Sequence, residues 1–107
     1  MKKSLMSLLA IMALTISANA ACTTTGCSDV GVDRFLVASN GNILIAPVGG
    51  LVGVNCTPVL DFYVTIQATD AGAKSMYSYL LTAKTTNQNI SFAIVEGSAT
   101  CDLAFVY

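Results

Sequence analysis

Four cysteines are the residues of this 107-residue chain with the most definite chemistry. They are Cys22, Cys27, Cys56 and Cys101. An even number of cysteines in a small exported chain predicts disulfides, and two bonds can be formed from these residues in three ways. We expect Cys22–Cys27 and Cys56–Cys101, because the second pair would join the middle of the chain to its last strand and contribute about 2–4 kcal/mol. A metal site is the weaker alternative, since the chain has neither histidine nor a Cys-x-x-Cys pair.

Carboxylates are the remaining candidates for catalysis. Without histidine, the chain cannot form a Ser–His or Cys–His nucleophile pair or a histidine metal ligand. Asp29 and Asp33 are an example of two acids that could act as general acid and base. Solvated surface charge is the simpler interpretation of both, and a calcium site involving them or Asp102 lacks a recognisable loop spacing. We therefore expect no catalytic residue, no metal and no cofactor.

Residues 1–20 have the parts of a bacterial secretory signal peptide. A positively charged start is followed by an apolar run and by small residues at positions 18 and 20. A retained anchor is the alternative, but membrane spans usually need about 20 apolar residues. We expect cleavage after residue 20, which leaves one secreted or periplasmic domain over residues 21–107 and no membrane span. A lipoprotein modified at Cys22 is a third interpretation, although Asn19 stands where a lipobox prefers leucine.

The predicted mature domain is small and weakly acidic. A chain of this size buries only about 60–65% of its unfolded surface, so its core is marginal without crosslinks. Because Lys2 and Lys3 belong to the predicted signal peptide, three basic residues remain against six acidic ones. Nucleic acids and anionic membranes are bound by clustered lysine and arginine. Neither is therefore an expected partner.

A hairpin is the clearest local prediction. Asn40 and Gly41 separate two runs of β-forming residues, and this dipeptide favours a type I′ turn because both residues tolerate positive φ. We expect strands at 33–39 and 43–48.

A third strand and a helix follow. Residues 59–68 alternate between apolar and polar, with Tyr63 on the polar, solvent-facing side. The period then changes to that of a helix, with Asp70 as the expected N-cap and Lys84 near the C-terminal end. The expected apolar stripe consists of Ala73, Met76, Tyr77, Leu80 and Leu81.

Two further alternating segments, 90–95 and 101–107, predict the last strands. Three strands, a helix and two strands is the element order of an OB-fold barrel. We therefore expect an α+β, mainly β domain with the helix between the third and fourth strands. The alternatives are a small five-stranded OB-like barrel and a flatter antiparallel sheet.

A family resemblance is carried by two segments, GCSDVGVDRFLVASNGNILI and SMYSYLLTAKTTNQNISFAIVEGSATCDLAFVY. They resemble the receptor-binding B subunits of subtilase-cytotoxin and pertussis-type toxins in helix register and cysteine placement. The resemblance implies a glycan or protein receptor as partner and assembly into a homo-oligomeric ring. The chain departs from that group by its shorter length, by its lack of tryptophan and by the absence of a matching serine–tyrosine pocket.

Four residues are candidates for binding. Tyr63 and Tyr79 lie off the predicted apolar faces, and exposed tyrosines can stack on sugars or anchor a protein contact. Asn87 and Asn89, with Gln88 between them, can hydrogen-bond a sugar. Ordinary surface coverage and a polar turn are the alternative interpretations.

Three hypotheses about function remain open. The first is a non-enzymatic exported binding domain for a glycan or a protein receptor, and the second is a small monomeric inhibitor or accessory protein acting through a loop such as 48–58. The third is a hydrolase that uses carboxylates alone. Extended apolar stretches favour either subunit association or a closed barrel core.

Overall fold

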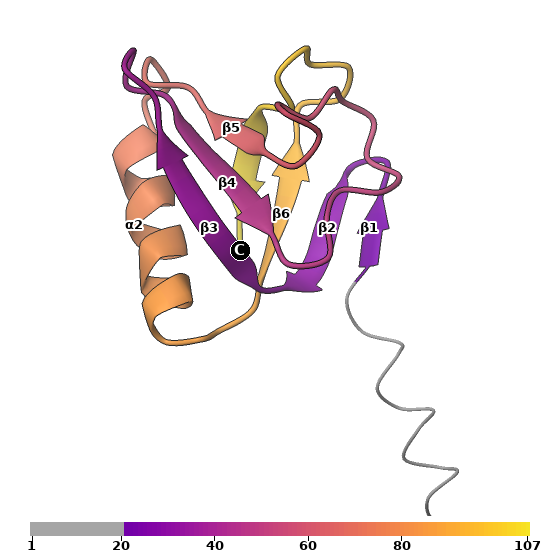
Figure 1. The fold of residues 1–107 in the computed structure, drawn as a ribbon, viewed down its shortest axis with the longest axis horizontal. Coiled ribbons are helices and arrows are strands. Elements are labelled where there is room, and N and C mark those ends of the chain that lie inside the picture. The colour runs from indigo at the N-terminus through magenta and orange to yellow at the C-terminus, as the bar shows by residue number, and fades with distance from the viewer. Residues whose placement is uncertain (1–20) are drawn as a thin grey trace, which may run out of the picture.

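The computed structural model describes residues 21–107, and the predicted signal peptide lies outside this range. The described chain forms a four-stranded antiparallel sheet in the order β1-β2-β6-β7 and a three-stranded antiparallel sheet in the order β3-β4-β5, with one helix (Figure 1). The elements are β1 (Ala21–Thr23), β2 (Gly26–Val30), β3 (Val32–Val37), β4 (Ile43–Pro47), β5 (Val64–Ile66), α2 (Ala73–Thr85), β6 (Ile90–Ile94) and β7 (Leu103–Val106). The expectation of a mainly β domain with one helix is confirmed.

The two sheets are not closed into a barrel. β2 continues directly into β3 past Gly31, so one bent segment belongs to both sheets. On the other side, within residues 21–107, the sheets meet at a single parallel bridge between Thr65 and Asp102. There the backbone N–H of Thr65 donates to the Cys101 carbonyl at 3.0 Å, and the Thr65 hydroxyl donates to the Thr100 carbonyl at 2.7 Å. β5 has only three residues, which leaves no length for a continuous ladder.

The β3–β4 hairpin confirms the two predicted strands but not the predicted turn. Gly41 has a positive φ of 91°, whereas Asn40 is not among the residues with positive φ. The Gly41 N–H donates to the Ala38 carbonyl at 3.0 Å, and the Ala38 N–H donates to the Asn42 carbonyl at 2.8 Å. This is a type I turn followed by a left-handed glycine, so the type I′ prediction is wrong.

The third predicted strand is shorter than expected and its solvent-facing side was assigned wrongly. Tyr63 is only 6% exposed, and all three residues of β5 are buried. Leu60 and Phe62 are instead 67% and 56% exposed. The cause is a tight turn in which Leu60 and Asp61 have φ of 54° and 69°, because a turn there interrupts the alternation assumed from the sequence.

The helix begins and ends differently from the prediction. Gly72 is the N-cap and no side chain caps the helix, so Asp70 is not the N-cap. At the other end Asn87 adopts a left-handed φ of 58°, its N–H bonds the Lys84 carbonyl, and the Gln88 N–H bonds the Ala83 carbonyl at 2.8 Å. This is a Schellman ending, in which asparagine takes the place that glycine usually occupies.

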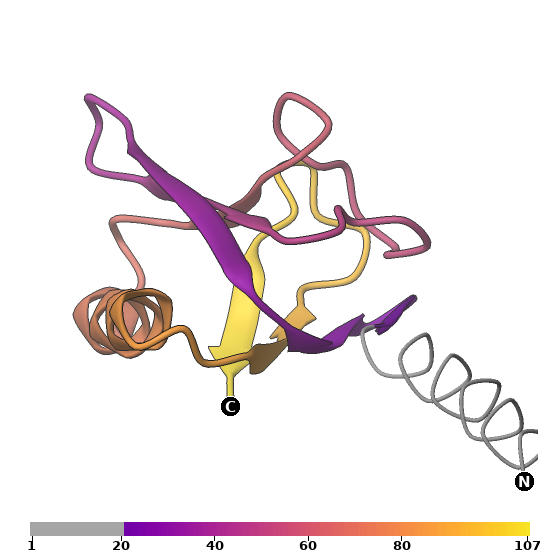
Figure 2. The same ribbon diagram turned by 60° about the horizontal axis from the view of Figure 1, so that its bottom comes forward.

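The core lies between the two sheets and the helix, which packs against β3, β5 and β7 (Figure 2). Leu80 and Ala83 are the buried residues of α2, whereas Leu81, predicted to belong to the apolar stripe, is 38% exposed. Tyr77 reaches Phe35 of β3 edge-to-face, with ring centroids 5.4 Å apart. The helix therefore covers the core by contacting β3 and β5 of one sheet and β7 of the other.

Both predicted disulfides are confirmed. Cys22–Cys27 crosses the β1–β2 hairpin, two strands that the sequence did not predict, and Cys56–Cys101 joins the β4–β5 connection to the start of β7. The sulfur of Cys22 is bonded to Cys27, so it is not free for the thioether of a lipoprotein. The lipoprotein interpretation therefore does not fit.

Candidate functional site

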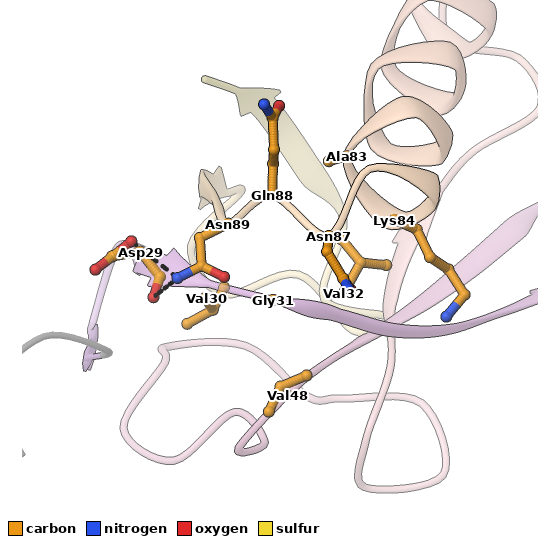
Figure 3. A pocket seen from close by; sticks show the side chains of 10 residues that line it. All are labelled: Asp29, Val30, Gly31, Val32, Val48, Ala83, Lys84, Asn87, Gln88 and Asn89. Atoms are coloured by element: carbon orange, nitrogen blue, oxygen red, sulfur yellow. Dashed lines mark hydrogen bonds between the residues drawn. The ribbon is translucent and has the colours of Figure 1, made fainter. Parts of the chain in front are cut away.

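A cavity of about 320 Å³ lies where the bend between β2 and β3 meets the C-terminal end of α2 (Figure 3). This volume is at the lower end of the range for small-molecule sites. We call it the amide cavity, after the three consecutive side-chain amides at its edge. Its lining consists of Asp29, Val30, Gly31, Val32, Val48, Ala83, Lys84, Asn87, Gln88 and Asn89.

Asp29 and Asn89 form the polar end of the amide cavity. Asp29 has a positive φ of 56°, at an irregularity of the β2–β6 ladder, and its N–H donates to the Ser91 hydroxyl at 3.1 Å. The Asn89 Nδ2 donates to the Asp29 carboxylate at 3.1 Å and approaches its carbonyl at 3.4 Å. Since Nδ2 makes these contacts, the Oδ1 of Asn89 remains as an acceptor for a ligand.

Asn87 is placed by the end of the helix. The Schellman bonds fix its backbone, and within residues 21–107 its side-chain amide makes no hydrogen bond that would occupy it. Figure 3 shows the Gln88 side chain extending away from both asparagines. Asn87 and Asn89 thus both contribute to the lining of the same cavity.

Lys84 supplies positive charge on the far side from Asp29. Its Nζ donates to the Asp33 carbonyl at 2.7 Å, which leaves further ammonium donors available. Between the charged ends the wall is apolar, with Val30 and Val32 buried and Val48 55% exposed. A ligand would therefore meet polar groups at both ends and hydrocarbon between them.

Gly31 keeps the floor of the amide cavity open. A Cβ added at this position would lie 3.2 Å from Val48 Cγ2 and 3.6 Å from Asn89 Oδ1. The space next to the acceptor oxygen of Asn89 therefore depends on the absence of a side chain. Sequence reasoning missed Gly31 and Lys84 as site residues and considered Val48 only as the start of the candidate loop 48–58. For Gly31 the only signal was a single glycine between two β-forming runs.

The four residues predicted to bind a ligand do not form one site. Asn87 and Asn89 are brought together, but Tyr63 is buried in the core. Tyr79 is 46% exposed and lines a different hollow of about 570 Å³ between α2 and β7, with Phe105 among its neighbours. Only the asparagine pair therefore contributes to the amide cavity.

The amide cavity does not bring together the two carboxylates suggested as a catalytic pair. Asp29 is the one carboxylate in its lining. Asp33, its suggested partner, lies outside the lining, and its carboxylate is 3.5 Å from the Arg34 Nε.

Across residues 21–107, no three metal-binding side chains gather into a group that could hold an ion. In the same range, no helix has the length and apolar character needed to cross a membrane.

Residues 21–107 form a small, doubly disulfide-bonded, mainly β domain with two open sheets and one helix. No protein-family model, curated protein or solved structure matches the chain.

Proposed function

We propose that this is an exported, non-enzymatic binding domain that recognises a small polar ligand, with a glycan as the first candidate, in the amide cavity. The observation that carries the proposal is the convergence of Asn87 and Asn89 on one cavity with hydrogen-bonding capacity to spare. Planar amides and carboxylates can bond neighbouring hydroxyl groups of a sugar ring. The valines between the polar ends would cover its C–H face, in keeping with sites that combine apolar walls with a few polar groups.

We also infer an OB-like architecture from the connectivity. If the short strand β1 is left out and β2 and β3 count as one bent strand, the helix falls between the third and fourth strands, as in an OB-fold. The parallel bridge between Thr65 and Asp102 then places the third strand beside the last one. OB-folds commonly bind oligosaccharides and oligonucleotides, and the acidic composition of this chain favours the former.

Export and self-assembly belong to the same proposal. The pattern of residues 1–20 and two disulfides are compatible with a secreted or periplasmic location. The resemblance to toxin B subunits adds ring formation, which light scattering of the oxidised domain at about 10 µM tests directly.

A monomeric accessory or inhibitor role is the second candidate function. It is favoured by the hollow between α2 and β7, where Tyr79, Val95 and Phe105 are 46%, 49% and 55% exposed. Exposed apolar groups gathered around a hollow are typical of protein-binding surfaces. If the domain binds no glycan but binds a protein through this hollow, the accessory or inhibitor role replaces the first proposal.

Loss of the amides is expected to weaken glycan binding about tenfold for each position, because each removes one or two ligand hydrogen bonds. The variants are Asn89→Ala and Asn87→Gly; glycine keeps the left-handed backbone of the helix end while removing the amide. The measurement is a glycan-array screen of the oxidised domain, followed by calorimetric titration of the strongest hit.

The matched control is Asn55→Ala, an exposed asparagine whose amide bonds Glu96 outside the cavity. It should bind like the parent domain. Equal loss in all three variants, or unchanged affinity in both cavity variants, would reject the amide cavity as the glycan site.

A further inference from the structure

The connection between β4 and β5 contains a tight turn with two left-handed residues that are not glycine. Leu60 has φ of 54° and Asp61 has φ of 69°. The Phe62 N–H donates to the Val59 carbonyl at 3.1 Å, and Val59 and Tyr63 exchange two backbone hydrogen bonds of 3.0 Å. Two consecutive positive φ values are the requirement of a type I′ turn, which normally contains asparagine, aspartate and glycine.

Leucine is an unfavourable residue for this backbone. The left-handed conformation brings its Cβ close to the following carbonyl oxygen, and only glycine, asparagine and aspartate adopt it routinely. Asp61 fits this rule, and Leu60 does not. Such strained positions concentrate at binding sites and persist only where the surrounding structure holds them.

The structure holds this turn on both sides. Cys56 is tied to Cys101, and the Thr57 N–H donates to the Ser98 carbonyl at 3.1 Å. On the other side Tyr63 is buried at 6% exposure and leads into the fully buried β5. The turn is therefore a preorganised feature, which lowers the entropy lost when it meets a partner.

The exposed part of this turn, residues 60–62, is apolar with one charge; we call it the 60–62 tip. Leu60 and Phe62 are 67% and 56% exposed on either side of Asp61. Within residues 21–107 the Asp61 carboxylate takes part in no ion pair. In Figure 2 one loop of the β4–β5 connection, in rose, projects away from the strands.

We propose that the 60–62 tip inserts into a concave apolar pocket of a partner protein that carries a lysine or arginine at its rim. The tip is convex, so its partner must be concave, and the two apolar side chains set the chemistry of the pocket. The unpaired Asp61 carboxylate requires a cation beside it, since an unpaired charge at a desolvated contact is costly. Insertion into lipid is disfavoured by the same carboxylate and by the acidic domain. This surface shares no residue with the amide cavity, so the two proposals stand or fall separately.

The strain itself is tested by Leu60→Asn. Asparagine tolerates the left-handed backbone, so the midpoint of thermal unfolding should rise by about 5 °C. Val52→Asn is the matched control, because Val52 lies in the same connection, is 84% exposed and is not among the residues with positive φ. A rise of equal size in both variants, or in neither, would remove the strain on which the proposal depends.

The pocket chemistry is tested with two model hosts, an amino-substituted cationic β-cyclodextrin and a carboxymethylated anionic one, followed by amide chemical shifts. Both hosts offer a concave apolar cavity, but only the first offers a cation at its rim. We expect shifts centred on residues 59–63, about threefold tighter binding of the cationic host, and loss of that preference in Asp61→Asn. Phe62→Ser should lose about tenfold in affinity, whereas Phe105→Ser, at an almost equal 55% exposure, should not.

Binding at another surface, binding of the 60–62 tip to lipid, or self-association through the tip would each overturn the proposal. Chemical shift changes centred on Phe105 or Tyr107 would show that the hosts bind elsewhere than at the 60–62 tip. Equal affinity for both hosts would contradict the need for a cation at the rim of the pocket. Binding to phosphatidylcholine vesicles that Phe62→Ser abolishes would assign the tip to a lipid surface. Concentration-dependent mass that the same variant abolishes would assign it to a second copy of this chain.

Discussion

Replacing Gly26 with alanine is expected to lower the free energy of unfolding by more than about 3 kcal/mol. A Cβ at this position would overlap the carbonyl oxygen of Phe92 and lie 2.8 Å from the Cα of Ala93. Both obstacles are backbone atoms of β6, so no side chain can move aside to make room. The substitution must instead force β2 away from β6 in the middle of the four-stranded sheet.

Urea denaturation of the oxidised domain measures this effect, with Gly72→Ala as the matched control. Nothing lies within 4 Å of a Cβ placed on Gly72, whose φ is −92°. The control should change stability by about 1 kcal/mol or less, as expected for an exposed N-cap position. Similar stability of the two variants would show that β2 and β6 are not in such close approach at Gly26.

The role of Gly26 marks a limit of sequence-based prediction for this chain. Between Cys22 and Cys27 the residues are small and polar, and they predict a loop rather than a strand. The structure instead pairs Gly26 with Ala93, which lies far along the chain. A close approach of two backbones leaves no local pattern beyond the glycine itself.

Elements with an uninterrupted period were predictable. The hairpin strands, α2, β6 and β7 each carry enough alternating or helical positions to define their type, and the disulfide pairing followed from loop closure. The prediction that Tyr63 faces solvent was wrong, because the turn at Leu60 contains no glycine that would have indicated a turn in the sequence. The predicted barrel would have needed a long third strand. The alternating residues 59–68 indicated such a strand, but β5 has only three residues.

Some residues of the amide cavity could likewise be foreseen from the sequence, and others could not. Asn87 and Asn89 are neighbours in sequence, so their meeting at the helix end could be foreseen from a polar turn. Asp29 and Val48 reach the cavity only because β2, β3 and β4 fold back toward that turn. Long-range topology of this kind cannot be deduced from one sequence by periodicity.

Removal of the Cys56–Cys101 disulfide is expected to lower the free energy of unfolding by about 4 kcal/mol, and removal of Cys22–Cys27 by about 2 kcal/mol. The two bonds close sequence separations of 45 and 5 residues, and a longer closed loop restricts the unfolded chain more. The double variants Cys56→Ser/Cys101→Ser and Cys22→Ser/Cys27→Ser serve as each other's control. Their midpoints and slopes in urea are the measurement.

Removal of the Cys56–Cys101 disulfide should also destabilise the region around Cys101 more than the rest of the domain. The Cys101 carbonyl accepts the Thr65 N–H at the only bridge between the two sheets within residues 21–107, and its partner Cys56 anchors the segment that leads to the 60–62 tip. Without the bond, amide exchange should therefore accelerate at Thr65 and residues 59–63 before the β3–β4 hairpin is affected. Equal stability losses in the two double variants, with uniform exchange, would mean that the sheets are held together by their core alone.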